Sequence, residues 1–320
     1  GVENRFPADA ERGHLQISQW GDHLATAEGS VSRANLPLSM ATAFYYLDGT
    51  TMVSIAEALG HDGDAKQYQA LADDIRDAFN ARFYDAELGY YESGIQSAQA
   101  WPLAFGLVPE DQVKRVSRYL VSSVGDVQRR LTTGYVGTKF AIQALASAGH
   151  DDMVWDLACK TEYPSWGYML RNNRTTSCER WDGDGGSLNH APLGAAIDEW
   201  FYWGLAGIRP DDSAPGFEKI IFKPHLPADL PWARATLQTP RGEVVSHWKH
   251  DGETATLKLT IPANSTAKVY LPTADPEDVR EEDRALDEAE GIERIGFEEK
   301  ALCLSIGSGS YTFTFPLLRD

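Results

Sequence analysis

The chain has 320 residues, 42% of them hydrophobic, which is enough to bury a large core and, by length, to form two domains. Its formal net charge of −18 disfavours nucleic acids and anionic membranes as partners, and it has no run of about eighteen apolar residues that would predict a membrane-spanning helix. The three cysteines are odd in number and form no CxxC pair, which argues against a disulfide framework or a zinc knuckle.

The first residues, GVENRFPADAERGH, have neither the apolar core of a signal peptide nor an initiating Met. We therefore expect Gly1 to be a cloning remnant, a processed end or a cut within a longer chain. The compartment stays open between the cytoplasm and, if a signal has been removed, the periplasm or the exterior.

Residues 31–206 carry the pattern of consecutive amphipathic helices, with apolar residues at three- and four-residue spacing. Short turns separate the helices, and we find no strand signal between them. The predicted helices cover 31–59, 64–84, 96–106, 109–124, 136–148, 151–160 and 190–206. Such an arrangement predicts helical hairpins in a bundle, a solenoid or an α/α-barrel. The solenoid ranks lower because the sequence has no fixed period.

The period changes after residue 208. Runs such as ATLKLTI at 255–261 alternate between apolar and polar residues, and Pro and Gly punctuate them every eight to twelve residues. We predict an all-β module, most simply an antiparallel β-sandwich, over residues 209–320, after a helical domain over residues 1–208. Residues 273–300 contain twelve acidic and four basic residues, and we interpret this segment as a solvated loop.

The segment 161–200 places aromatic, acidic and histidine side chains close together in the sequence. Three glycines interrupt it, and it combines indoles with carboxylates and an imidazole: Trp166, Tyr168, Trp181, Trp200, Glu162, Glu179, Asp182, Asp184 and His190. Pyranose rings offer apolar faces to aromatic side chains and hydroxyl groups to carboxylates and imidazole, so this composition indicates a sugar site. The loops 19–30, 86–99 and 129–135 share its character, and they add Trp20, Asp22 and Trp101 as candidate contacts.

Other functional motifs are missing. The sequence has no phosphate loop and no dinucleotide fingerprint, and the histidines of the β-module have no metal-ligand spacing. The run Asp182-Gly183-Asp184-Gly185-Gly186 is similar to a calcium loop but lacks its third acidic ligand and its glutamate at position twelve, which leaves at most a weak ion site built from Asp182 and Asp184. We therefore predict no cofactor and no metal.

Several motifs, in order along the chain, resemble the bacterial α-L-rhamnosidases of glycoside hydrolase family 78. They are Gly21-Asp22, LTTGYVGT at 131–138, TEYPSWGYM at 161–169, TTSCERWDG at 175–183, SLNH at 187–190 and the helix ending at Ile208. The resemblance spans nearly the whole chain. It implies an (α/α)6-barrel-like helical-hairpin domain followed by a C-terminal β-sandwich, and thus an α+β multidomain fold.

The resemblance also implies roles for single residues. Glu179 matches the general base of an inverting hydrolysis, which takes a proton from the water that attacks the anomeric carbon. His190 matches an imidazole that contacts substrate, and Trp166 and Trp181 match aromatic walls. Asp22 matches a polar residue at the edge of the site. The implied partner is a rhamnose-containing glycoside or polysaccharide.

The chain departs from the family pattern in three ways. Residues 1–160 contain no DxxxRDExxGW-like motif to supply the general acid, His23 follows Asp22 where the family usually has Trp, and the helices are fewer than the twelve of a closed barrel. We therefore expect either a C-terminal piece of a longer enzyme or a reduced relative. The acid would come from a missing N-terminal segment, a partner chain or an unrecognised residue.

Three functions follow from these observations. The first is inverting hydrolysis of terminal α-L-rhamnosyl linkages, with Glu179 as the base. The second is a rhamnosidase-like polysaccharide lyase acting next to a uronate, for which Arg171, Arg174 or Arg180 would bind the carboxylate. The third is a non-catalytic carbohydrate-binding fragment.

Overall fold

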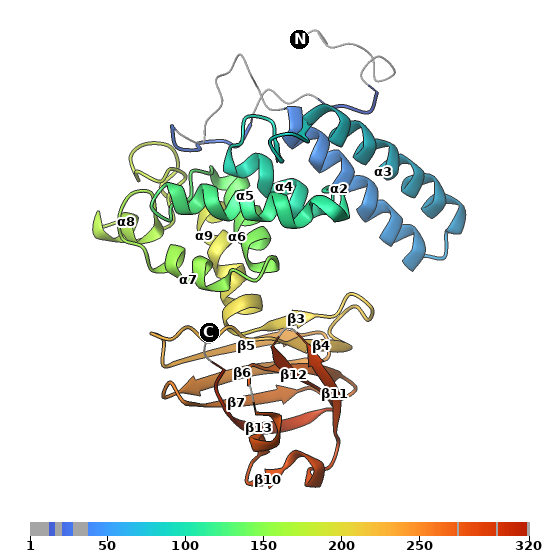
Figure 1. The fold of residues 1–320 in the computed structure, drawn as a ribbon, viewed down its shortest axis with the longest axis vertical. Helices are drawn as coiled ribbons and strands as arrows, with labels where there is room; N and C mark the ends of the chain where they lie inside the picture. Colours follow the sequence, from blue (N-terminus) through green and yellow to red (C-terminus); the bar gives the residue numbers. More distant parts are fainter. Residues whose placement is uncertain (1–12, 17–20, 28–37, 274, 299, 319–320) are drawn as a thin grey trace. The chain divides into compact units, whose positions relative to one another are not determined.

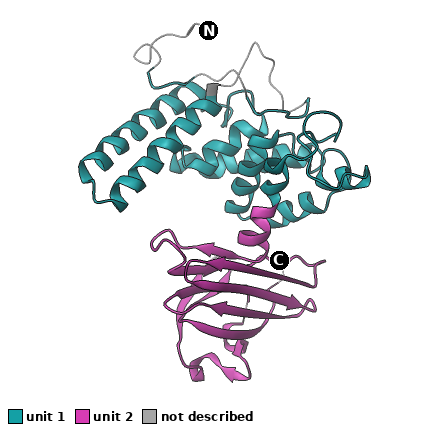
Figure 2. Cartoon of the chain, turned by 180° about the vertical axis from the view of Figure 1, so that it is seen from behind, with its two compact units in different colours: residues 1–197 teal, residues 198–320 magenta. Residues whose placement is uncertain are grey.

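The structure is a computed structural model that describes residues 13–16, 21–27, 38–273, 275–298 and 300–318. The chain forms two compact units, residues 1–197 and residues 198–320 (Figure 2). The division falls inside a helix, and the domain boundary at residue 208 stays a prediction. Within the described ranges, no helix is both long and apolar enough to cross a membrane.

The first unit is built of helices joined by short connections (Figure 1). They are α2 (Leu38–Ala58), α3 (Asp62–Phe83), α4 (Gln96–Phe105), α5 (Val113–Asp126), α6 (Tyr135–Ser147), α7 (Asp151–Cys159), α8 (Trp166–Arg171) and α9 (Ala191–Trp200). The predicted helices are confirmed to within a few residues, except that residues 31–37 lie outside the described part of the chain. Helix α8 was not predicted, because its six residues are too few to show a helical period.

Helices α2 and α3 form a hairpin that shows how the pattern builds the unit (Figure 1). Ala72, Ile75 and Phe79 lie on one face of α3 and are fully buried. Gly60 closes the turn between the helices with a φ of +71°, which a residue without a Cβ adopts easily. The spacing of apolar residues in the sequence therefore predicts which face of α3 is buried.

The prediction that no strand lies between the helices is wrong at one place. Strands β1 (Tyr84–Asp85) and β2 (Tyr90–Tyr91) form a short antiparallel hairpin between α3 and α4. Two residues per strand give no period, so a pattern search cannot detect such a hairpin.

The second unit contains two β-sheets (Figure 1). The six-stranded sheet has the order β10-β9-β13-β7-β6-β5 and the five-stranded sheet the order β11-β12-β8-β4-β3. The strand bounds are β3 Ile208–Pro210, β4 Lys219–Phe222, β5 Trp232–Thr239, β6 Gly242–His250, β7 Thr254–Ile261, β8 Thr266–Leu271, β9 Arg280–Glu281, β10 Arg284–Ala285, β11 Ile292–Glu298, β12 Ala301–Ile306 and β13 Gly309–Pro316. The predicted antiparallel β-module is confirmed, with the one difference that β4 pairs with β8 in parallel.

A π-helix over Phe201–Leu205 continues α9 into the β-unit. Two side chains of β6 bind the backbone at its end: Ser246 Oγ donates to the carbonyl of Ala206 at 2.7 Å, and the indole of Trp248 donates to that of Leu205 at 2.8 Å. Both side chains are fully buried, so these bonds satisfy carbonyl groups that would otherwise lose water without compensation.

The interpretation of residues 273–300 as a loop is wrong. This segment forms β9, β10 and β11, with one short 3-10 helix before β9 and another between β10 and β11. Its acidic side chains are partly compensated, since Arg294 pairs with Glu277 at 2.8 Å and with Asp287 at 3.2 Å. The acidic composition hid the strands because Asp and Glu are depleted in strands in general, so a segment rich in them gives little strand signal.

Candidate functional site

Asp22 fixes the start of α6. Its Oδ2 accepts a hydrogen bond from the backbone N–H of Gly134 at 2.7 Å, and its Oδ1 accepts one from Gly137 at 2.8 Å. A helix N-terminus presents unpaired N–H groups, and a carboxylate is a good acceptor for them. Asp22 therefore attaches the 21–27 segment to α6 and brings its neighbour His23 to the same place.

The close approach of the two segments explains the glycine before α6. A Cβ on Gly134 would lie 1.9 Å from the carbonyl oxygen of His23 and 2.8 Å from the nitrogen of Ala25. Both are backbone atoms and cannot turn away.

We expect Gly134→Ala to lower the free energy of unfolding by about 3 kcal/mol, measured by chemical denaturation. In Gly125→Ala, the matched control in α5, the new Cβ meets no atom within 4 Å. The free energy of unfolding of Gly125→Ala should equal that of the unmodified protein or exceed it by up to about 1 kcal/mol. Equal effects of the two substitutions would contradict the packing argument.

Asp22 also makes the stability of the helical unit depend on pH. Burial raises the pKa of Asp22 from 3.8 to about 6, although the N–H groups of Gly137 and Gly134 oppose the rise. The folded state therefore binds more protons than the unfolded state between these two values. The stabilisation is complete below pH 3.8 and is lost as the pH rises through about 6.

We expect the unfolding free energy of the unmodified protein to increase relative to that of Asp22→Asn as the pH falls from about 7 to about 5, because Asn does not titrate. Urea denaturation followed by circular dichroism at both pH values measures this difference. A difference between the two proteins that stays constant with pH would contradict the assignment to Asp22.

The segment 172–190 folds back on itself, so that residues at its two ends become neighbours. The N–H of Glu179 donates to the carbonyl of Ser187 at 2.9 Å, and the N–H of His190 donates to that of Ser177 at 2.7 Å. Gly183, Gly185 and Gly186, at the far end, have φ angles of +71°, +77° and +66°, so the fold of the loop explains why glycines occupy these positions.

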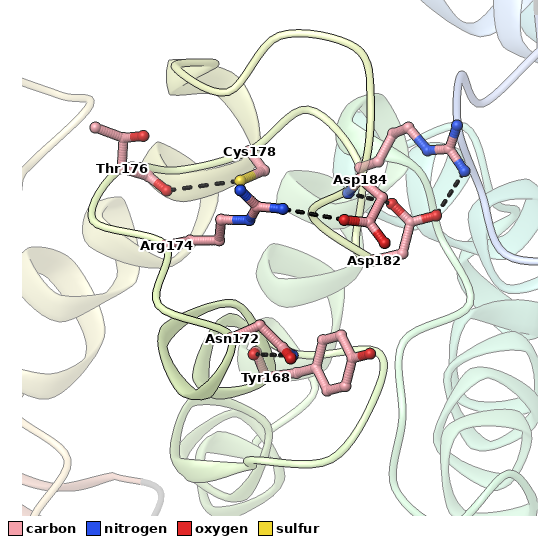
Figure 3. A network of polar contacts seen from close by, with 8 residues as sticks. Tyr168, Asn172, Arg174, Thr176, Cys178, Asp182 and Asp184 are labelled. Atoms are coloured by element: carbon pink, nitrogen blue, oxygen red, sulfur yellow. Dashed lines mark hydrogen bonds and ion pairs between the residues drawn. The ribbon is translucent and has the colours of Figure 1, made fainter.

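Two ion pairs hold the far end of this loop. Arg174 Nη2 lies 3.0 Å from Asp184 Oδ1, and Arg180 Nη2 lies 2.5 Å from Asp182 Oδ2. Figure 3 shows Arg174 pointing toward Asp184, and the Sγ of Cys178 facing the carbonyl of Thr176. The charges of both arginines are therefore matched by carboxylates of the loop itself.

The loop orients the side chain of Glu179. One oxygen, Oε2, accepts a hydrogen bond from the N–H of Ser187 at 2.8 Å. The other, Oε1, lies 4.0 Å from Nε2 of His23, which is beyond hydrogen-bond distance. The side chain of Glu179 is 21% exposed. Glu179 is thus a half-buried carboxylate with one fixed oxygen and one oxygen facing an imidazole.

An aromatic row extends from His23 to the other end of the loop. The ring of Tyr135 contacts His23 at a centroid distance of 5.7 Å and His190 at 4.6 Å, both edge to face. The Nδ1 atom of His190 is buried without a hydrogen-bond partner among the described residues. The structure therefore brings two of the predicted site residues, Glu179 and His190, into one group with His23 and Tyr135.

The two predicted aromatic walls contact each other. The rings of Trp166 and Trp181 meet edge to face at 5.2 Å. Trp181 is 3% exposed, and its indole donates to the carbonyl of Thr133 at 2.7 Å. Trp166 is half-buried and donates to the carbonyl of Leu193 at 2.9 Å. Both indoles hold backbone segments together, and Trp166 is the less buried of the two.

Trp101 lies in a different environment. It is fully buried on α4, in a core cluster with residues of α2 and α3 such as Tyr46 and Phe79. This packing is that of a core residue and gives no support to a contact with sugar. Trp20 lies outside the described residues.

Reasoning from the sequence did not propose His23 or Tyr135 as site residues. His23 was singled out only as a departure from the family pattern, and Tyr135 only as part of the LTTGYVGT motif. The contacts between them connect residues more than a hundred positions apart, which no local pattern reports.

Two family models match the chain. The bacterial α-L-rhamnosidase six-hairpin glycosidase domain matches residues 4–205, and the bacterial α-L-rhamnosidase C-terminal domain matches residues 207–286. Similar curated proteins include an α-L-rhamnosidase of Alteromonas sp. (strain LOR), 32% identical over 81% of this chain and 29% of the relative. Another is an α-L-rhamnosidase of Formosa agariphila, 30% identical over 85% of this chain and 30% of the relative. The chain thus spans about 30% of the length of these relatives.

Solved structures agree. The α-L-rhamnosidase from Dictyoglumus thermophilum has a TM-score of 0.86 and 34% identity, covering 96% of this chain and 35% of that one. The Streptomyces avermitilis α-L-rhamnosidase complexed with L-rhamnose has a TM-score of 0.81 and 29% identity, covering 92% of this chain and 28% of that one. The chain therefore belongs to the bacterial α-L-rhamnosidases of glycoside hydrolase family 78, as part of a six-hairpin glycosidase domain followed by the C-terminal β domain.

Proposed function

We propose that the protein hydrolyses terminal α-L-rhamnosyl linkages in glycosides or polysaccharides, with inversion at the anomeric carbon and with Glu179 as the general base. Membership of the family supports the reaction class, and the solved relative complexed with L-rhamnose supports the sugar. The observation that carries the proposal is the asymmetric setting of Glu179, with one oxygen fixed and the other without a hydrogen bond among the described residues.

This setting suits a base that activates water. The bond from Ser187 orients the carboxylate, and Oε1 accepts the proton of a water molecule as its oxygen attacks the anomeric carbon. Inversion requires the acid on the opposite side of the sugar, with the two carboxyl groups about 6.5–9.5 Å apart to leave room for the water. The departing glycosidic oxygen takes its proton from that acid.

His190 and Trp166 are the proposed contacts with the sugar. The unpartnered Nδ1 of His190 suits a rhamnose hydroxyl, which could satisfy the buried nitrogen. Trp166 is only half-buried, and its indole suits the apolar side of a pyranose ring. In this proposal Asp22 and Trp181 support the site through the backbone rather than through the sugar, since their polar atoms bind Gly134, Gly137 and Thr133.

We place the general acid outside the described residues. Asp22 does not suit the role, although its pKa is raised to about 6, because backbone N–H groups occupy both of its oxygens. The chain aligns with only about 30% of the length of its curated relatives, and we propose that the acid corresponds to a segment of those relatives outside this alignment.

The test compares two substrates of the 320-residue chain. Nitrophenolate is a good leaving group and needs little help from an acid, whereas an alkyl alcohol needs a proton. We expect the chain to release nitrophenol from p-nitrophenyl α-L-rhamnoside and to hydrolyse methyl α-L-rhamnoside far more slowly, with β-L-rhamnose as the first product by NMR. Rhamnose binding without turnover of either substrate would favour the non-catalytic fragment. If the chain neither binds rhamnose nor hydrolyses either substrate, the proposal is overturned.

The lyase alternative receives no support from the loop. Recognition of a uronate needs an uncompensated cation, but Arg174 and Arg180 are paired with Asp184 and Asp182. Arg171 lies 4.0 Å from Glu162. An unsaturated product absorbing in the ultraviolet would nevertheless identify a lyase in the same assay.

A further inference from the structure

The outward face of the six-stranded sheet carries an exposed tryptophan among cationic side chains. Strands β5, β6 and β7 are neighbours in this sheet (Figure 1). In their register Arg234 lies opposite His247, which lies opposite Lys258, and Trp232 lies opposite Lys249 in the adjacent row. Trp232 is 58% exposed, and its ring meets that of His247 edge to face at 6.2 Å. We call these five residues the cationic face.

The burial pattern of β6 places these residues on the solvent side. Val244, Ser246 and Trp248 are fully buried, so the alternating His247 and Lys249 point to the opposite face of the sheet. Arg234, Lys249 and Lys258 are all exposed. The cationic face is therefore open to a ligand.

The positive charges of this face are not neutralised within the part of the chain that the structure describes. No described carboxylate forms an ion pair with Arg234, Lys249 or Lys258. The strands themselves put one carboxylate on this face, Glu243, and it accepts a hydrogen bond from Gln238 at 3.2 Å. The β6–β7 turn adds Asp251 and Glu253, and Asp251 already accepts two backbone N–H groups.

Such a cluster costs stability, because like charges directly opposite each other in a sheet repel. The pKa of His247 is lowered, first by burial and then by the positive charges of Arg234, Lys258 and Lys249, which is the direction that repulsion predicts. The cluster also stands out in a chain whose formal charge is −18. An anionic ligand would relieve the repulsion.

We propose that the cationic face binds the uronate-bearing chain of an acidic polysaccharide. The exposed indole of Trp232 suits the apolar face of a pyranose ring, and Arg234 offers a forked donor for a carboxylate. Neighbouring strands are about 4.8 Å apart, and side chains on one face repeat about every 7 Å along a strand. The indole of Trp232 and the cationic groups are therefore spaced so that they can contact neighbouring sugar units of one polysaccharide chain. This binding does not require catalysis by Glu179, and it would hold the protein on a polymer that carries rhamnose.

The probe is polygalacturonate, which contains no rhamnose, so the result is independent of the proposed hydrolysis. We expect the 320-residue chain to bind it in calorimetry and to bind its methyl ester, the same polymer without carboxylate charge, at least about tenfold more weakly. Trp232→Ala and Arg234→Gln should each weaken binding about tenfold or more, and added salt should weaken it further.

Two substitutions serve as matched controls. Phe297→Ala removes a 53% exposed aromatic side chain from β11 of the other sheet, and Lys66→Gln removes an exposed positive charge from α3. Both should leave polygalacturonate binding unchanged. The proposal is overturned by absence of binding, by equal binding of the acid and its ester, or by equal losses in the controls. It is also overturned if dextran sulfate or single-stranded DNA binds as tightly as polygalacturonate, since the face would then respond to charge alone.

Discussion

Replacing Glu179 with Gln should reduce hydrolysis of p-nitrophenyl α-L-rhamnoside by about a thousandfold, within the range that a general base contributes. The amide has nearly the shape of the carboxylate but cannot take a proton from water. Its oxygen can keep the hydrogen bond from Ser187, so the loop should keep its fold. The loss should therefore appear in kcat, and rhamnose binding, measured by calorimetry, should change little.

Glu162→Gln is the matched control for this substitution. Glu162 belongs to the same segment of the sequence, but its side chain is 69% exposed and lies 4.0 Å from Arg171. The same chemical change at this position should leave kcat within about twofold, because exposed ion pairs contribute little. Full activity of Glu179→Gln, or an equal loss in both variants, would exclude Glu179 as the base.

Replacing Gly186 with Ala should reduce the same activity by about tenfold to a hundredfold, although residue 186 has no reactive group. A Cβ there would lie 2.7 Å from Oε2 of Glu179, the oxygen that Ser187 holds. The carboxylate would have to move away and would lose this hydrogen bond. Displacement of a catalytic group by about 1 Å is enough for an effect of this size.

Gly185→Ala separates this displacement from backbone strain. Gly185 has a φ of +77° and Gly186 one of +66°, so Ala is similarly strained at both positions. At residue 185, however, the nearest atom to the new Cβ is Nη1 of Arg180 at 3.8 Å, an ordinary contact. We expect the two variants to lose similar stability in chemical denaturation, about 1 kcal/mol, and only Gly186→Ala to lose activity. Equal losses of activity would mean that strain in the loop, rather than contact with Glu179, is responsible.

Local patterns in the sequence predicted most of the longer helices and strands of this protein, and its family. The spacing of apolar residues in α3 predicts the face that Ala72, Ile75 and Phe79 bury, because a helix repeats every 3.6 residues whatever it packs against. The alternation in β7 predicts a strand for the same reason. The motif around Glu179 predicts the family, which the comparisons confirm. By contrast, the hairpin β1–β2 and the six-residue helix α8 are too short to leave a periodic signal.

The tertiary structure alone decided how the candidate site is assembled. The contacts of Asp22 with Gly134 and Gly137 join segments more than a hundred residues apart, and they bring His23 toward Glu179. From the sequence, Trp101, Trp166 and Trp181 are equal candidates for contact with a sugar. In the structure, Trp101 and Trp181 are almost completely buried, whereas Trp166 is half-buried. Residue type reports what a side chain can bind. Only packing, which depends on the whole chain, decides whether that side chain meets solvent, the backbone or a sugar.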